Sequence, residues 1–198
     1  MSLARLRAGV LIGGQSRRMG TPKHLIRVEG FSLLARTARV LRSHAERVSV
    51  IGTGELPEDA AEIERIHDAP DVAGPLAGIA AALRADAAAA WLIAATDLPN
   101  LTTDAIAWLV SMRCADCAAV IPRGARGLEP LLAIYEPHAN SAVEQLLAGG
   151  EFAPRLLAKH ATVHSPEIPA TLAAAWDNAN EPNDLRRLGV AGSDPRAG

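Results

Sequence analysis

The loop that follows the first apolar run of the chain combines glycines with cationic side chains. Gly13 and Gly14 have no β-carbon, so the backbone can turn sharply there and approach a ligand closely. Backbone amides in such a turn can point at phosphate oxygens, and three cations follow in the same loop, namely Arg17, Arg18 and Lys23. These residues form a candidate phosphate-binding loop. The alternative is an ordinary glycine-rich turn with a solvated basic face, and composition alone favours neither.

Two familiar phosphate-binding motifs do not fit the spacing of this loop. A dinucleotide-binding fingerprint requires GxGxxG, which the segment Gly13–Ser16 does not supply. A P-loop requires a lysine directly after its last glycine, whereas Gly20 is followed by Thr21-Pro22-Lys23. The loop therefore belongs to neither of these classes.

A carboxylate, Asp97, closely follows a strongly apolar segment, Ala90–Ala95. Open α/β sheets bind ligands at the carboxyl ends of their parallel strands. A single carboxylate at that edge suits Mg²⁺, which binds through one or two protein carboxylates together with phosphate oxygens and waters. We therefore assign Asp97 a metal-binding role. The alternative is that it caps the turn before the next helix.

Apolar segments and helical patterns alternate along the chain, and they supply the elements that must position these residues. We expect strands at residues 8–12, 47–51, 90–95, 117–121, 131–135 and 162–164. We expect helices at residues 32–43, 76–83, 102–112, 138–147, 153–159 and 183–188. Ser32 is a candidate N-cap of the first helix and Asn183 of the last. This alternation predicts an α/β fold with a mainly parallel sheet flanked by helices.

Composition and charge exclude several classes of protein. A chain of 198 residues suits a single domain, which we expect to span residues 1–190, with 191–198 as a disordered tail. A formal net charge of −2 and 3% aromatic residues argue against nucleic-acid binding. The longest apolar stretch, residues 87–95, is too short to span a membrane. We therefore expect a cytoplasmic protein that binds neither nucleic acid nor membrane.

The two cysteines form a CxxC motif, Cys114-Ala115-Asp116-Cys117. Two cysteines do not make a disulfide framework, and a zinc site requires a second pair of ligands. A redox-active CxxC normally lies where a strand leads into a helix, whereas this one lies between a helix and a strand. We therefore assign the motif no role.

The glycine-rich loop resembles the LxGGxSxRMGxxK signature of the molybdenum cofactor guanylyltransferases, also called molybdopterin-guanine dinucleotide biosynthesis protein A. Every fixed position of the signature is matched, by Leu11, Gly13, Gly14, Ser16, Arg18, Met19, Gly20 and Lys23. Four further segments resemble the family in the expected order, namely Asp68 with Gly74–Gly78, Thr96–Pro99, Glu129–Tyr135 and Asn178–Leu185. The resemblance thus extends over residues 8–188.

This resemblance implies a Rossmann-like nucleotidyltransferase fold, with a nucleotide-binding N-terminal half and a molybdopterin-binding C-terminal half. It implies transfer of GMP from GTP to the terminal phosphate of molybdopterin, with or without molybdenum, and release of pyrophosphate. The implied cofactor is Mg²⁺, and the implied partners include proteins that mature molybdoenzymes, through transient contact. Such transfers depend on positioning and charge neutralisation rather than on a covalent intermediate.

The resemblance also implies roles for individual residues of this chain. Catalysis would depend on Lys23, which neutralises phosphate charge, on Asp97, which holds the metal, and on Arg18. The nucleotide would contact Leu11, Ile12, Gly13, Gly14, Lys23, Asp68 and Asp97. Molybdopterin would contact Asn178 and Asn180. The alternative for these two asparagines is a purely structural role in capping the short helix that follows.

Two departures from the family pattern bear on the nucleotide site. Ile12 stands where the family usually has alanine, and Ile51–Gly54 offers no asparagine where the family often has one. The nearest rival is a molybdopterin cytidylyltransferase that uses CTP, but the paired glycines and the NxNxP tail favour GTP. A second rival is a non-catalytic cofactor-binding protein of the same fold, which the presence of both Lys23 and Asp97 disfavours.

Overall fold

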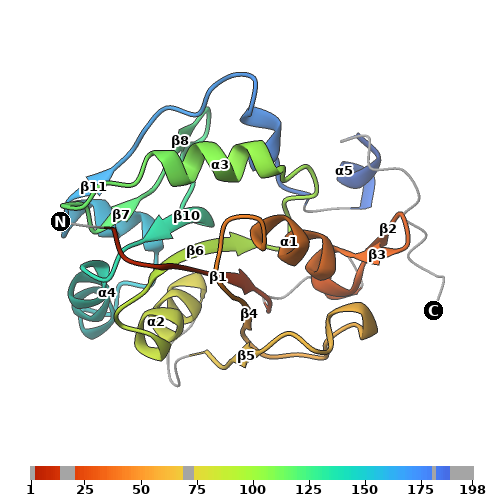
Figure 1. Cartoon of the computed structure of the whole chain (residues 1–198), viewed down its shortest axis with the longest axis horizontal. Coiled ribbons are helices and arrows are strands. Elements are labelled where there is room, and N and C mark those ends of the chain that lie inside the picture. Colours follow the sequence, from red (N-terminus) through yellow and green to blue (C-terminus); the bar gives the residue numbers. More distant parts are fainter. Residues whose placement is uncertain (1–2, 14–20, 69–73, 180–181, 188–198) are drawn as a thin grey trace.

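The computed structural model describes residues 3–13, 21–68, 74–179 and 182–187, whose arrangement is drawn in Figure 1. Seven strands form the central sheet, namely β1 Leu6–Leu11, β4 Val48–Ile51, β5 Arg65–Ile66, β6 Ala90–Ala95, β7 Ala119–Val120, β10 Leu132–Tyr135 and β11 Val163–His164. Their order across the sheet is β11-β7-β10-β6-β1-β4-β5. The sheet therefore draws strands from both halves of the chain.

Most neighbouring strands of this sheet run parallel. β1 pairs in parallel with β4 and β6, and β4 pairs in parallel with β5. β10 runs antiparallel to β6 and β7, whereas β11 is parallel to β7. Four adjacent strands, β6, β1, β4 and β5, thus share one direction, and the expected mainly parallel sheet is confirmed.

Helices cover both faces of the sheet, as Figure 1 shows. The α-helices are α1 Leu33–Leu41, α2 Pro75–Ala85, α3 Thr103–Ser111, α4 Ala139–Ala148 and α5 Pro182–Arg187. α1 and α3 pack on one face, and α2 and α4 pack on the other. The hydroxyl of Ser32 accepts a hydrogen bond from the amide of Ala35 at 3.0 Å, which confirms Ser32 as the N-cap of α1. Among the described residues, no helix is long and apolar enough to cross a membrane.

Alternate residues of β6 point into two separate apolar layers. Leu92 and Ala94 contribute to the layer with α1 and α3, while Trp91 and Ile93 contribute to the layer with α2 and α4. All four side chains are fully buried. Burial on both faces explains why this strand is an unbroken apolar run instead of an alternating pattern.

Several short elements have no counterpart in the sequence-based expectations. Two hairpins occur, β2 Arg27–Val28 with β3 Phe31–Ser32, and β8 Arg123–Gly124 with β9 Gly127–Leu128. Three short 3-10 helices occur as well, η1 Lys23–Leu25, η2 Glu58–Ala60 and η4 Ala173–Trp176. Segments of two to four residues are too short to carry a recognisable hydrophobic period.

The helix expected at residues 153–159 is present as a 3-10 helix, η3 Pro154–Lys159. It begins with a proline and has six residues, which is long for a 3-10 helix. The last helix, α5, starts at Pro182, so Asn183 lies within it and is not its N-cap. Proline is favoured at such a first position because its missing amide would be unpaired there anyway.

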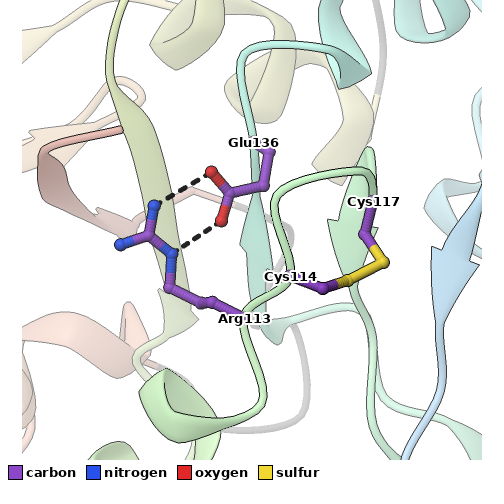
Figure 2. The surroundings of a disulfide bond; sticks show 4 residues. All are labelled: Arg113, Cys114, Cys117 and Glu136. Carbon is purple, nitrogen blue, oxygen red and sulfur yellow. Dashed lines mark hydrogen bonds and ion pairs between the residues drawn. A yellow bond between two sulfur atoms is a disulfide. The ribbon is translucent and has the colours of Figure 1, made fainter. Parts of the chain in front are cut away.

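A disulfide joins Cys114 and Cys117 in the loop between α3 and β7, as Figure 2 shows. The CxxC spacing alone did not predict this bond. The loop holds the two Cα atoms 5.4 Å apart, within the range that disulfides require. Since the cysteines are only three positions apart, the bridge removes little conformational entropy from the unfolded chain.

A buried ion pair lies beside this disulfide (Figure 2). Arg113 donates two hydrogen bonds to Glu136, from Nε to Oε1 at 2.6 Å and from Nη2 to Oε2 at 2.9 Å. Arg113 also donates to the carbonyl oxygen of Ala4 at 2.8 Å. These bonds connect the segment after α3, the residue after β10 and the segment that leads into β1.

Candidate active site

Four parallel strands each lead into a residue that lines the same cavity, at the same distance beyond the end of the strand. β1, β4, β5 and β6 end at Leu11, Ile51, Ile66 and Ala95. Two positions further along stand Gly13, Thr53, Asp68 and Asp97, respectively. Because parallel strands end at the same edge of a sheet, these four residues gather there. They line a cavity of about 400 Å³, which we call the sheet-edge cavity.

The sheet-edge cavity brings together most of the residues that the sequence analysis singled out for the nucleotide. Its lining includes Leu11, Ile12, Gly13, Lys23, Asp68 and Asp97. Gly14, Arg18 and Asn180 lie outside the described residues. Three further polar residues of the lining had no assigned role, His24, Thr53 and Thr96. His24 and Thr96 directly adjoin Lys23 and Asp97 in the sequence. This adjacency could have identified both residues as candidates for the site.

Two loops meet closely at the base of the sheet-edge cavity. The amide of Ile12 donates to the carbonyl oxygen of Ile51 at 2.8 Å, which extends the pairing of β1 with β4. Gly52 has φ +118°, and a β-carbon there would collide with the carbonyl oxygen of Ile12. Gly13 has φ +98°. Both positions require the conformational freedom of glycine, and the resulting backbone presents residues 12–13 to the cavity.

Lys23 and Asp97 form an ion pair in the lining of the cavity. Lys23 Nζ lies 3.2 Å from Asp97 Oδ2, and the two side chains are 19% and 20% exposed. Lys23 begins η1 and Asp97 follows β6, so the pair joins segments that are 74 positions apart. Lysine binds phosphate as a compact charge, so an anionic ligand can take the place of Asp97 as its partner.

His24 is almost fully buried and supports one wall of the sheet-edge cavity. Its Nε2 lies 2.9 Å from the carbonyl oxygen of Glu55, and because a carbonyl oxygen only accepts, Nε2 carries the proton. Burial lowers the pKa of His24, so the ring is neutral at pH 7. The ring thereby ties η1 to the loop after β4, which contains Thr53.

Asp68 follows β5, at the opposite end of the four-stranded edge from Asp97. Three strand spacings separate β5 from β6, which amounts to roughly 14 Å. Burial raises the pKa of the Asp68 carboxyl, and the nearby charge of His67 opposes this effect. A β-carbon at residue 78 would come within 3.3 Å of Asp68 Oδ1, so Gly78 leaves room for this carboxylate in the wall of the cavity.

The segment before α5 reaches the Asp97 end of the sheet-edge cavity. The amide of Ala179 donates to the carbonyl oxygen of Asp97 at 2.8 Å. Ala179 is itself buried in a small apolar cluster with Ile26, Val28, Leu33 and Leu185. The backbone on either side of Asn178 is therefore fixed beside a residue that is far away in the sequence.

A smaller cavity of about 240 Å³, which we call the hairpin cavity, lies between the β8–β9 hairpin and η4. Its lining includes Arg123, Arg126, Glu129, Ile168, Trp176 and Asp177. It shares no lining residue with the sheet-edge cavity. Asp177 lies only two positions before Ala179, whose amide is bonded to Asp97, so one short segment connects the linings of the two cavities.

Asp97 lies in the lining of the sheet-edge cavity, where a carboxylate could share a divalent cation with a bound phosphate. Within the part of the chain that the structure describes, no group of three or more His, Cys, Asp or Glu residues could hold a metal ion. Mg²⁺ in nucleotide sites needs only one or two protein carboxylates, because phosphates and waters supply the other ligands. The donor chemistry at Asp97 therefore fits Mg²⁺ bound together with a phosphate ligand, and not a metal site closed by protein side chains.

Sequence comparison relates the chain to nucleotidyltransferases. Residues 8–163 match the family model described as the MobA-like NTP transferase domain. A "probable molybdenum cofactor guanylyltransferase" from Opitutus terrae is 40% identical over 152 residues, which are 74% of this chain and 74% of that protein. A protein of the same description from Pelotomaculum thermopropionicum is 29% identical over 194 residues, which are 96% of this chain and 94% of that protein.

Structural comparison agrees with the sequence matches. The fold is similar to that of molybdopterin-guanine dinucleotide biosynthesis protein A from Archaeoglobus fulgidus, with a TM-score of 0.77 and 26% identity. That similarity covers 92% of this chain and 96% of the other. The matched family segment contains Gly13, Lys23, Asp68 and Asp97, whereas Asn178 lies beyond its end.

Proposed function

Because this chain belongs to the MobA-like NTP transferase family and is a nucleotidyltransferase, we propose that it transfers GMP from GTP to the terminal phosphate of molybdopterin. The observation that carries the proposal is the sheet-edge cavity, where Gly13, Lys23, Asp68 and Asp97 meet from four distant segments. Its similarity to proteins described as molybdenum cofactor guanylyltransferases supports the choice of substrates.

In this proposal, GTP lies along the sheet edge with its phosphates near Lys23 and its base toward Asp68. The backbone at Gly13, which lines the cavity, supplies an amide for a phosphate oxygen. Guanine carries two adjacent donors, the ring N–H and the exocyclic amino group, and an ionised carboxylate offers two acceptor oxygens. Asp68 is thus suited to guanine, whereas cytosine has no comparable pair of adjacent donors.

Asp97 would hold Mg²⁺ in the loaded enzyme, where the cation neutralises charge on the triphosphate. Its carboxylate lies beside Lys23, at the end of the edge that we assign to the phosphates. A bare carboxylate at this position would repel GTP. The proposed metal role therefore accounts for an acidic side chain in a phosphate site.

The proposed reaction requires this chain to bind and orient both substrates and to neutralise the charge of their phosphates. An oxygen of the acceptor phosphate attacks the α-phosphorus of GTP, and the bond from that phosphorus to the pyrophosphate oxygen breaks as the new bond forms. The second pKa of a phosphate monoester is near 6, so the attacking oxygen needs no protein base at neutral pH. Lys23 stabilises the negative charge that develops on the departing pyrophosphate.

Molybdopterin would bind beside Asp97, where the segment that contains Asn178 and Ala179 reaches the edge of the sheet. The hydrogen bond from Ala179 to the Asp97 carbonyl holds Asn178 next to the site of transfer. The amide side chains of Asn178 and Asn180 would then contact molybdopterin. The hairpin cavity, whose lining includes Asp177 from the same segment, offers room for the part of the acceptor that lies farthest from its phosphate.

The experiment that tests this function measures pyrophosphate release with purified molybdopterin, Mg²⁺ and either GTP, CTP or ATP. We expect turnover to be fastest with GTP. Equal or faster turnover with CTP would identify a cytidylyltransferase instead. Tight binding of molybdopterin without pyrophosphate release from any nucleotide would identify a non-catalytic binding protein.

A further inference from the structure

The hairpin cavity combines apolar residues with charged side chains of both signs. Trp176, which is 3% exposed, and Ile168 belong to the apolar part of the lining, and Arg123 and Arg126 supply guanidinium groups. Arg126 Nη2 donates to the carbonyl oxygen of Trp176 at 3.2 Å, which ties the hairpin to η4. The cavity is therefore held by contacts between separate elements, and its lining suits a planar, polar heterocycle.

Among the acidic side chains that line this cavity, Glu129 and Glu167 differ sharply in exposure. The side chain of Glu129 is 18% exposed, whereas that of Glu167 is 77% exposed. Arg126 approaches Glu129 only to 4.0 Å. Burial raises the pKa of Glu129, Arg126 opposes the rise, and the charges of Asp177 and Asp97 add to it. Within the described part of the chain, Glu129 is thus a desolvated acceptor with Arg126 as a counter-charge 4.0 Å away.

We propose that Glu129 accepts hydrogen bonds from the aminopyrimidinone edge of the pterin ring in the acceptor substrate, an inference that rests on the proposed function. That edge presents a ring N–H and an amino group side by side, and both are donors. The two oxygens of an ionised carboxylate accept from both at once. Trp176 and Ile168 contribute apolar surroundings for the ring, and the pterin donors supply partners for the Glu129 carboxylate.

The position of the hairpin cavity supports this occupant over the nucleotide. At about 240 Å³ it is smaller than the sheet-edge cavity of about 400 Å³, and the two share no residue. Asp177 leads within two positions to Ala179, which is bonded to Asp97. A ring bound at Glu129 therefore lies next to the site of transfer without competing with GTP.

The test compares pterin with lumazine, which carries an oxo group in place of the amino group. Titration of the full-length protein, followed by the fluorescence of each ring, should give an affinity about tenfold higher for pterin. In Glu129→Gln, the carboxamide accepts from the ring N–H and donates to the oxo group. This variant should therefore bind lumazine more tightly than pterin.

Glu167→Gln is the matched control, because it removes a carboxylate from the exposed rim of the same cavity. It should retain the preference for pterin. Equal binding of both rings by the wild-type protein, or an unchanged preference in Glu129→Gln, would overturn the inference. A melting curve and a GTP titration on each preparation report whether the variant is folded.

If Glu129→Gln does not fold, Glu129→Asp is the variant that tests the inference. Its shorter carboxylate should weaken pterin binding severalfold with little change for lumazine, and equal effects on both rings would overturn the inference. The GTP titration also separates the two proposals. If the protein prefers pterin but binds no GTP, the proposed function is wrong, but the recognition of pterin by Glu129 still holds.

Discussion

At the scale of single residues, the proposed function requires Lys23 and Asp97 to change partners when GTP binds. In the structure they neutralise each other at 3.2 Å, and both side chains are about four-fifths buried. Charges at such positions are costly without a partner. GTP and a cation supply new partners for both residues at once, so the exchange leaves neither charge uncompensated.

We expect Lys23→Ala to weaken GTP binding by about 1.5–3 kcal/mol, the contribution of a hydrogen bond to a charged group. The uncompensated Asp97 would act in the same direction by repelling phosphate. Calorimetric titration with GTP measures the effect. Lys159→Ala removes an exposed lysine at the end of η3 and should leave the affinity unchanged. Wild-type affinity and turnover in Lys23→Ala would contradict the assigned role.

Asp97→Asn keeps the size of the side chain but removes the charge that would hold the metal. We expect this variant to fold, to bind GTP weakly through the glycine-rich loop, and to lose most transfer activity. A melting curve, GTP titrations with and without Mg²⁺, and a pyrophosphate-release assay test these three points. Asp104→Asn, at an exposed position of α3, controls for loss of a carboxylate. Near-normal turnover with the usual Mg²⁺ dependence in Asp97→Asn would eliminate the metal role.

Asp68 should determine base selectivity. We expect the wild-type protein to prefer GTP over ITP by about tenfold, because inosine lacks the amino group that one carboxylate oxygen would accept. Asp68→Asn should reduce this preference, whereas Glu62→Gln, at an exposed position, should not. Protonation removes the acceptor, and burial raises the pKa of Asp68 above the usual 3.8. The preference should therefore decline as pH falls toward that raised pKa. A ratio that Asp68→Asn leaves unchanged would place the base elsewhere.

At the scale of elements, the fit between the loops after β1 and β4 depends on Gly52. A β-carbon there adds a collision with Ile12 to the strain of φ +118°. Gly127 is a matched control, because its φ is +106° but a β-carbon would meet no atom within 4 Å. Gly127→Ala should cost about 1–3 kcal/mol of unfolding free energy through backbone strain alone.

Gly52→Ala should cost more than Gly127→Ala and should also weaken GTP binding, because Ile12 lines the sheet-edge cavity. Urea unfolding and GTP titration of both variants provide the comparison. Equal losses of stability, together with unchanged GTP affinity, would show that the contact between the two loops has no role in forming the site.

At the scale of the whole molecule, the Arg113–Glu136 pair joins segments that lie far apart in the sequence. Both side chains are nearly inaccessible, at 6% and 4% exposure. Glu136→Gln leaves the Arg113 charge buried without a counter-charge, and we expect a loss of about 3–5 kcal/mol in unfolding free energy. The exposed Arg84–Glu144 pair has two bonds of 2.7 Å, so Glu144→Gln is a control with similar geometry.

The control variant, Glu144→Gln, should change the free energy of unfolding by only about 0.2–1 kcal/mol, because solvent screens an exposed pair. Urea unfolding of both variants measures the difference. Similar losses in the two variants would mean that burial does not determine the contribution of the Arg113–Glu136 pair. Guanidinium–carboxylate geometry would then be the controlling factor.

The sequence by itself determined the main elements and the residues able to do chemistry. Apolar runs such as Ala90–Ala95 and the capping residue Ser32 encode their structure locally, so they could be recognised without tertiary information. The glycine-rich loop and the position of Asp97 after a buried strand likewise predicted a phosphate-binding edge. Short hairpins and 3-10 helices escaped prediction because two to four residues carry no periodic signal.

Tertiary structure alone decided which residues meet. The order β6-β1-β4-β5 aligns Gly13, Thr53, Asp68 and Asp97 along one edge. The bonds from His24 to Glu55 and from Ala179 to Asp97 join segments with no shared pattern. The burial of Glu129 depends on how a short hairpin packs against η4. Hydrophobic periodicity specifies the face that an element buries, but strand order and the contacts of loops depend on packing between distant segments, which no local pattern encodes.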